Sequence, residues 1–458
     1  SGGTLQLTDN GTLASDLTMA GGTLDVDESL AISGTLTPSG DFTVDVAAGK
    51  TLRYDNYELR IGNYELAFKG EGTFAFADNV SALVLDDVQS LLRLDSPGTL
   101  EAVRVTVASS AGRGLAINAS GTISKLEVLA DSELHIASGN TLSGTAEVAD
   151  NATLKLGGGG TLGGDLALRG VLEASGSPTV SGTITPLDNA TLSIPDAGTT
   201  LTYAGDNLTV GSHTLTLAGA GTFANVAGSL IILDLPESVL HLSGTGAVTG
   251  SVRLEGCTLK ATGAPTLSGT LTQWDNATIE VASGSTLAYS GPSLSLGVHT
   301  LTLSGGGTLA NTNALRLDQP DSTLALDGIG SVGAVSVTAD ANAGKGLKVG
   351  QSATLGKLSV VLEAYPELKG NETMEQFMSK ILGFAPIWEA FAQLCEDDVQ
   401  KLEAAYNNLE EINQTKLFPN TNLEIHKPKA IDVIGFIVCL VVCFAIIGMA
   451  VWIAGIGG

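Results

Sequence analysis

The amino-acid sequence predicts a mainly β protein: a parallel β-helix (β-solenoid), followed by an α-helical region and a C-terminal transmembrane helix. Three observations support this fold class: a long internal repeat, short apolar alternations through the first 360 residues, and an uncharged apolar run near the end. They divide the chain into a solenoid rod (1–361), a helical collar (362–425), and a juxtamembrane segment with the span (426–458).

The internal repeat is a block of about 87 residues that occurs twice. One copy opens at Ser181 with SGTITPLDNATLSI, and the other opens at Ser268 with SGTLTQWDNATIEV. A looser copy, SGTLTPSGDFTVDV, opens at Ser33. Repetition at a fixed spacing is typical of stacked units that bury their apolar faces only against their neighbours. It therefore favours a solenoid over separate globular domains.

The rod region consists of short Thr-Leu-x-Leu segments separated by Gly, Asn and Asp, such as TLQL at Thr4, TLKL at Thr153 and TLAL at Thr323. Alternation with a period of two, bounded by turn-forming residues, predicts β-strands. We expect Leu, Val and Ile to point inward and stack from turn to turn, while Thr and Ser point outward. About 15 turns of roughly 20–25 residues would make a rod of about 70 Å.

The helical pattern begins where glycine becomes rare, after Val361. Thr373 and Gln376 match a capping box, and Pro386 suits the first turn of a second helix. Apolar residues then recur at three- and four-residue steps from Trp388 to Ile412, which predicts an amphipathic helix. Its apolar face would pack on the first helix or on the rod, or would form a homo-oligomer through helices 373–413.

The apolar run predicts a membrane span at Ile431–Ile453, because about 20 apolar residues cross the hydrocarbon core of a bilayer. The lipid bilayer is therefore an expected partner. His426, Lys427 and Lys429 precede the span, and by the positive-inside rule they would place the rod in the cytoplasm. Solenoids of this composition are mostly exported, however, and we favour a rod outside the cytoplasm, at the cell surface or in the periplasm.

The chain is strongly acidic, with a formal net charge of −26. An acidic rod repels nucleic acid and anionic lipid headgroups, so no nucleic-acid partner is expected. The four cysteines have no metal-ligand spacing and predict no disulfide framework; they are Cys257, Cys395, Cys439 and Cys443. Because the sequence opens inside the repeat pattern without Met, we expect a processed product or a piece of a longer polypeptide.

The repeat region resembles the passenger repeats of bacterial surface adhesins and autotransporters. The likeness covers residues 1–360 and rests on the Thr-Leu-x-Leu segments and on DNAT turns at Asp150, Asp188 and Asp275. It implies a right-handed parallel β-helix used for surface display, adhesion or spacing. DNAT is also an acceptor sequence for N-glycosylation, but its fixed place in the repeat favours Asn and Asp in turns.

A segment within residues 363–420 is similar to the LemA family of helical-bundle proteins. The matching stretches are AYPELKGNE at Ala364–Glu372, AYNNLEEIN at Ala405–Asn413 and LFP at Leu417–Pro419. LemA proteins carry their anchor at the N-terminus, whereas here the anchor follows the helices, and the first half of the bundle is missing. The resemblance implies no catalytic residues.

Candidate catalytic carboxylates are Asp86, Asp87 and Asp95, with Arg93 and Arg104 nearby in the sequence. Carbohydrate-active β-helix enzymes use such groups in one groove. Paired carboxylates at a turn are far more often a solvated surface, so we assign no catalytic role to them.

The histidines lack partner spacing for catalysis; they are His135, His213, His241, His299 and His426. His213 and His299 occupy the same repeat position, which favours a structural role. The run at Gly157–Asp165 has the residue types of a calcium-binding repeat without its spacing or tandem copies. We therefore predict no catalytic, cofactor-binding or metal-binding residue and no cofactor, with calcium as the weaker alternative.

The function predicted from these features is a membrane-anchored extracellular or periplasmic stalk that is structural and adhesive and is not an enzyme. A glycan or a protein on another surface is its expected ligand. One alternative is a subunit of a multimeric membrane complex or surface filament assembled through the helices and the span. The other is a carbohydrate-active β-helix enzyme.

Overall fold

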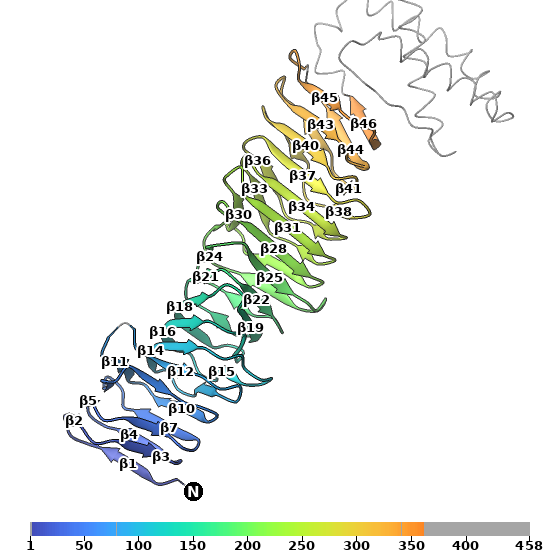
Figure 1. The fold of residues 1–458 in the computed structure, drawn as a ribbon. Coiled ribbons are helices and arrows are strands. Elements are labelled where there is room, and N and C mark those ends of the chain that lie inside the picture. The colour runs from blue at the N-terminus through green and yellow to red at the C-terminus, as the bar shows by residue number, and fades with distance from the viewer. Residues whose placement is uncertain (1, 79, 340, 361–458) are drawn as a thin grey trace, which may run out of the picture.

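The computed structural model describes residues 2–360 except 79 and 340, and this part of the chain is a parallel β-solenoid of about 16 turns. Figure 1 shows the turns stacked into an elongated rod, with β1 at one end and β45 and β46 at the other. The predicted mainly β solenoid and its repeat organisation are confirmed. The predicted helical collar, the LemA-like segment and the membrane span lie outside the described residues.

Most turns contribute three short strands, one to each of three faces of the rod. The first face is sheet 1, with 17 parallel strands. In spatial order, sheet 1 contains β1 (Thr4–Leu7), β4 (Thr23–Val26), β7 (Phe42–Val46), β10 (Glu65–Gly70), β13 (Leu91–Leu94), β15 (Gly114–Ile117), β17 (Ser132–Ile136), β19 (Thr153–Gly158), β22 (Val171–Ala174), β25 (Ala190–Ile194), β28 (Thr214–Gly219), β31 (Val239–Gly244), β34 (Thr258–Gly263), β37 (Ala277–Val281), β40 (Thr300–Ser304), β43 (Thr323–Asp327) and β45 (Gly346–Val349).

The second face is the longer file of sheet 2, again entirely parallel. In spatial order it contains β2 (Gly11–Leu13), β5 (Leu30–Ile32), β8 (Thr51–Tyr54), β11 (Thr73–Phe76), β14 (Thr99–Val105), β16 (Gly121–Val128), β18 (Thr141–Val148), β20 (Thr161–Leu162), β23 (Thr179–Val180), β26 (Thr200–Tyr203), β29 (Thr222–Asn225), β32 (Ala247–Val248), β35 (Thr266–Leu267), β38 (Thr286–Tyr289), β41 (Thr308–Asn311), β44 (Ser331–Val337) and β46 (Thr354–Val360).

The third face is discontinuous. It consists of β3 (Leu17–Met19), β6 (Leu36–Pro38), β9 (Glu58–Arg60), β12 (Ala82–Leu85), β21 (Leu166–Leu168), β24 (Ile184–Pro186), β27 (Leu208–Thr209), β30 (Leu230–Leu233), β33 (Ser251–Leu254), β36 (Leu271–Gln273), β39 (Leu294–Ser295) and β42 (Leu315–Leu317). The long strands β14, β16, β18 and β44 cover both the second and the third face, so β12, β21 and β42 pair directly with them.

The core is the stack of inward side chains along the axis of the rod. The outward Thr and inward Leu alternate as predicted in most Thr-Leu-x-Leu segments; in β26, for example, Leu201 and Tyr203 are fully buried. The exceptions include Leu5 in the first strand, which is 40% exposed, and Thr323, which is buried. One inward stack crosses six consecutive strands of sheet 1 in register: Leu215, Leu240, Leu259, Ile279, Leu303 and Leu326. None of these side chains is more than 1% exposed. This burial supplies the main driving force for stacking.

Equivalent aromatic positions of the three repeat copies are buried alike. Tyr54, Tyr203 and Tyr289 end equivalent strands of the three copies and are no more than 2% exposed. The length of a turn varies between the strands of sheet 1, from 18 residues between Thr153 and Val171 to 26 between Leu66 and Leu92. Loops at the corners absorb this variation, so the strands keep their parallel register.

The DNAT segments form turns, as predicted. The side-chain oxygen of Asn189 accepts a 2.7 Å hydrogen bond from the N–H of Thr214, and Asn276 does the same for Thr300. Asn151 adopts a positive φ of 60°, a conformation that Asn tolerates better than most residues. The Asn189 and Asn276 side chains thus tie one turn of the solenoid to the next.

Candidate functional site

A file of threonine hydroxyls runs along sheet 2. Thr51, Thr73, Thr99 and Thr122 oppose one another directly on β8, β11, β14 and β16. Each is half-buried, and neighbouring strands are about 4.8 Å apart. The file matches the predicted ladder of outward Thr side chains. It offers regularly spaced donors and acceptors without charge.

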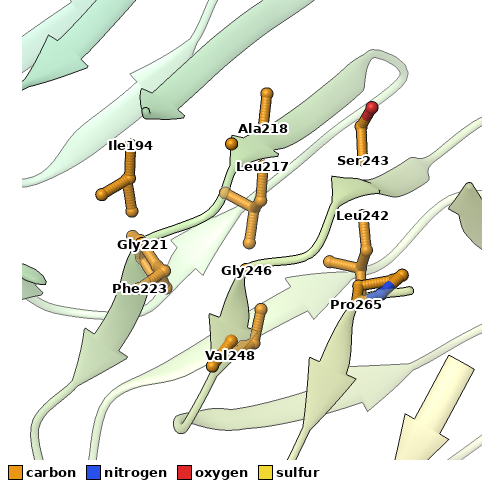
Figure 2. A pocket seen from close by; sticks show the side chains of 12 residues that line it. Ile194, Leu217, Ala218, Gly221, Phe223, Leu242, Ser243, Gly246, Val248 and Pro265 are labelled. Atoms are coloured by element: carbon orange, nitrogen blue, oxygen red, sulfur yellow. The ribbon is translucent and has the colours of Figure 1, made fainter. Parts of the chain in front are cut away.

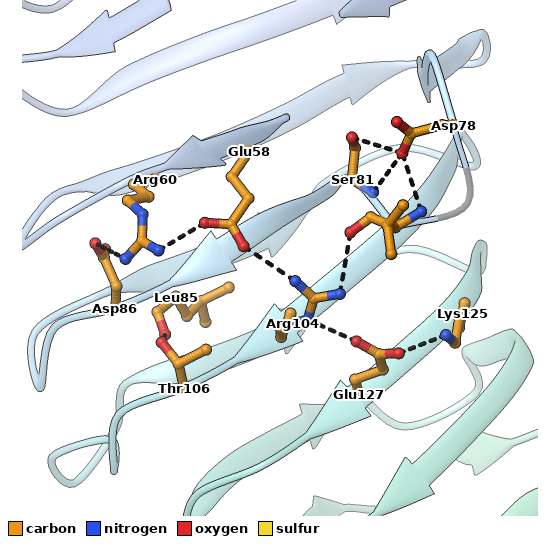
Figure 3. Close-up of polar contacts among 11 residues, drawn as sticks. Glu58, Arg60, Asp78, Ser81, Leu85, Asp86, Arg104, Thr106, Lys125 and Glu127 are labelled. Carbon is orange, nitrogen blue, oxygen red and sulfur yellow. Dashed lines mark hydrogen bonds and ion pairs between the residues drawn. The ribbon is translucent and has the colours of Figure 1, made fainter. Parts of the chain in front are cut away.

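A network of ion pairs lies on the third face, as Figure 3 shows. Arg104 donates from Nη1 to Glu58 at 3.0 Å and from Nε to Glu127 at 2.6 Å. Arg60 donates to the other oxygen of Glu58 at 2.6 Å and to Asp86 at 3.4 Å. The network therefore bridges several turns through side chains that are far apart in the sequence.

The centre of this network is partly shielded from water, since the Arg104 side chain is 16% exposed and that of Glu58 is 13% exposed. Burial acts to raise the pKa of Glu127, but hydrogen bonds from Lys125 and Arg104 lower it below its ordinary value. The hydrogen bond to Glu127 in turn raises the pKa of Arg104. Each charge thus stabilises the ionised form of its neighbour.

Replacing Arg104 with glutamine is expected to weaken the rod at neutral pH and to have little effect in acid. The lowered pKa of Glu127 means that its stabilising contribution is present above its unfolded value of 4.5 and is lost as pH falls through the lower folded value. Urea unfolding at pH 7 and at pH 3 measures this difference. Lys155→Gln is the control, because Lys155 lies 3.9 Å from Glu133 and Glu173, which is too far for a hydrogen bond to either carboxylate. An equal loss at both pH values would contradict the argument.

Asp86 and Asp87, the predicted acidic pair, both support turns. Asp86 accepts the N–H of Gly62 at 2.9 Å. Asp87 accepts the N–H of Gln89 at 2.8 Å, and its own N–H donates to Ser90 at 3.0 Å. Asp86 therefore accepts from the backbone of the preceding turn of the solenoid, and Asp87 accepts from the backbone of its own loop.

Asp95 belongs to a different corner, after β13. It pairs with Arg93 at 2.5 Å and accepts a 2.7 Å hydrogen bond from Asn118. Burial acts to raise the pKa of Asp95, but these hydrogen bonds lower it. The structure thus divides the sequence cluster: Asp95 is joined to Arg93, Asp86 to Arg60, and Arg104 to Glu58 and Glu127.

The described histidines lie on separate turns. His241 approaches the hydroxyl of Thr262 at 2.9 Å, and burial followed by the charge of Lys260 lowers its pKa. His299 lies 4.0 Å from Asp275. His213 and His299 follow the equivalent glycines of two repeat copies. His426 lies outside the described residues.

The glycine-rich run at Gly157–Asp165 is part of the solenoid wall, and Asp165 accepts the N–H of Thr183 at 2.9 Å. Among the described residues no group of three or more His, Cys, Asp or Glu side chains is placed to hold a metal ion. Cys257 is free and buried, and burial raises the pKa of its thiol to about 11. The other three cysteines lie outside the described residues.

A small, partly open cavity of about 20 Å³ lies between turns of the rod, as Figure 2 shows. Its lining is mainly apolar and includes Ile194, Leu217, Phe223, Leu242 and Val248. At most one water molecule fits in such a volume. The cavity is a packing gap and is too small for a ligand.

Sequence reasoning did not single out Trp274. It lies on the turn between β36 and β37, with 61% of its surface exposed. The guanidinium of Arg253 lies 4.6 Å from the centre of its ring. The sequence feature that could have identified Trp274 is a difference between the two repeat copies: the other copy has Leu187 at the same position.

In comparisons with known proteins, no family model matches the chain, and no curated protein or solved structure is detectably similar to it. The fold itself defines the class as a parallel β-solenoid repeat protein. In the part of the chain that the structure describes, no helix has the length and apolar character needed to cross a bilayer.

Proposed function

We propose that the protein is a membrane-anchored stalk with a structural and adhesive role. The observation that carries this proposal is the unbroken sheet 1, in which 17 strands join one end of the rod to the other. About 16 turns at the spacing of paired strands correspond to a length of about 75 Å. Because every turn is hydrogen-bonded to its neighbours, such a rod suits spacing and display.

The proposed anchor is the apolar run at Ile431–Ile453. A rod outside the cytoplasm, at the cell surface or in the periplasm, would present the threonine file and the acidic surface to other molecules. The alternative is a subunit of a multimeric membrane complex. It draws support from the apolar stripe between Trp388 and Ile412, which suits assembly of several helices.

The full chain is expected to stay in the membrane fraction after alkaline carbonate washing. Placing charges at the bilayer centre is costly, so Val441→Lys with Val442→Lys should release the chain, whereas Val441→Leu with Val442→Leu should not. Light scattering of the detergent-extracted protein should give one chain of 46.4 kDa per micelle, and negative-stain images should show single rods. Release of the unaltered chain by carbonate would contradict the anchor.

A symmetric ring or bundle of rods would instead identify the multimeric complex.

Protease added to intact cells or spheroplasts should digest an external rod. Protection of the rod until the membrane is broken would place it in the cytoplasm and overturn the proposed location.

A further inference from the structure

Trp274 is an exposed side chain that the structure holds in place. One face of its indole ring is covered by Arg253, whose guanidinium lies 4.6 Å from the ring centre. Arg253 is itself fixed by Glu255 at 2.5 Å. A cation over a tryptophan face is attractive, and the ion pair restrains the cation. The indole is therefore pre-organised while 61% of its surface faces water.

Two further apolar side chains are exposed on the same corner of the rod. Leu235 lies on the turn between β30 and β31, and Val298 lies on the turn between β39 and β40; they are 40% and 55% exposed. The turn of Trp274 is next to that of Val298, and the turn that carries Glu255 separates it from that of Leu235. At the spacing of paired strands the row extends over about 15 Å. Exposed apolar rows with a central aromatic are typical of binding surfaces.

The surroundings of this row are acidic. The Asp275 side chain is 64% exposed. Asp318 lies on the turn between β42 and β43, next to the turn of Val298, and pairs with Arg316 at 3.8 Å. Asp234 and Glu237 flank Leu235 on its own turn. Arg253 is neutralised by Glu255 and therefore contributes no free positive charge. Oxygen acceptors with negative charge thus dominate the border of the apolar row.

We propose that this surface, consisting of Leu235, Trp274 and Val298 with Arg253, Glu255 and Asp275, binds a protein partner. The contact segment of that partner would carry lysine or arginine side chains beside an apolar or aromatic side chain. The apolar group would pack on Trp274, and the cations would pair with the surrounding carboxylates. Such charge complementarity increases both specificity and the rate of association. The inference rests on the adhesive part of the proposed function.

A nucleic acid is excluded by the sign of the charge. A neutral glycan would stack on an indole, but it would need donors as well as acceptors around the ring. Arg253, the cation that the described part of the chain places against Trp274, is already paired with Glu255. The equivalent turn of the other repeat copy has Leu187, followed by the same Asp-Asn-Ala-Thr sequence. It provides a matched surface without the indole.

The test is a selection of random twelve-residue peptides displayed on phage against the full chain in detergent, with removal of phage that bind the Trp274→Ala variant. The selected peptides should carry net positive charge and an apolar or aromatic residue. Trp274→Ala should weaken binding of the synthetic peptides by about 30-fold or more. Asp275→Asn should weaken it less and reduce its dependence on salt. Leu187→Ala should leave it unchanged.

The inference is overturned if the selected peptides bind Trp274→Ala as well as the unaltered chain, if they lack net positive charge, or if none is recovered. It is also overturned if chitobiose, cellobiose or lactose binds and Trp274→Ala abolishes that binding, since the surface would then be a glycan site. An unchanged urea midpoint for Trp274→Ala excludes misfolding. Carbonate washing and rod imaging test the anchored stalk separately, so failure of the surface does not imply failure of the stalk.

Discussion

Replacing Gly244 with valine is expected to open the middle of the rod. Gly244 has a φ of +107°, and a Cβ atom there would lie 2.3 Å from the carbonyl oxygen of Gly219. That oxygen cannot move away easily, because it accepts 3.0 Å hydrogen bonds from the N–H groups of Thr245 and Gly246. The unfavourable φ and the backbone clash together should cost at least about 3 kcal/mol of unfolding free energy.

The control for this substitution is Gly228→Val. Gly228 has a similar φ of +96°, but nothing lies within 4 Å of its Cβ position. Gly228→Val should therefore lower the unfolding free energy only by the cost of the backbone conformation, about 1–2 kcal/mol. Urea unfolding measures the difference, and hydrogen exchange should show local opening around Gly219, Gly244 and Gly263. If Gly244→Val and Gly228→Val lowered the unfolding free energy equally, the close approach of Gly219 would not be the reason that position 244 requires glycine.

Replacing Ser238 with alanine is expected to destabilise the turn between β30 and β31 by about 1–3 kcal/mol. The hydroxyl is fully buried; it accepts the N–H of Leu235 at 3.1 Å and donates to the carbonyl oxygen of Gly211 in the preceding turn. Alanine would leave both backbone groups without their partner and away from water. Ser322 makes the same two contacts with Gln319 and Gly297, so Ser322→Ala should behave alike.

The exposed Ser212 provides the control for the buried serines, and Ser212→Ala should change the unfolding midpoint very little. Ser90, in the looser repeat copy, also donates to the carbonyl of a glycine, Gly62, at 2.6 Å. If Ser238→Ala and Ser212→Ala had equal effects, the buried hydroxyl would not be the group that fixes the turn.

Much of the rod could be predicted from short-range patterns. The alternation of Thr and Leu identifies the strands and their inward side, because successive side chains of a strand point to opposite faces. The repeated DNAT segments identify turns, and Asn189 and Asn276 are found there. The prediction of about 15 turns is close to the observed 16 or so.

Contacts between turns could not be predicted. Arg104 and Glu58 pair across 46 residues of sequence, and which charge opposes which depends on the length of each intervening turn. Because that length varies, the sequence cluster around Asp86 and Asp95 is divided between two corners of the rod. For the same reason the pairing of Arg253 with Trp274, 21 residues apart, was not anticipated.

The sequence alone determined the solenoid, its inward and outward residues and its repeat, since these follow from a local period and from self-similarity. The predicted collar and membrane span also come from the sequence alone. Only the tertiary structure decided the registers of the turns, and with them the ion pairs, the buried serine contacts and the surface around Trp274. A register is the sum of many loop lengths, and its energy depends on side chains that meet only after the turns have stacked.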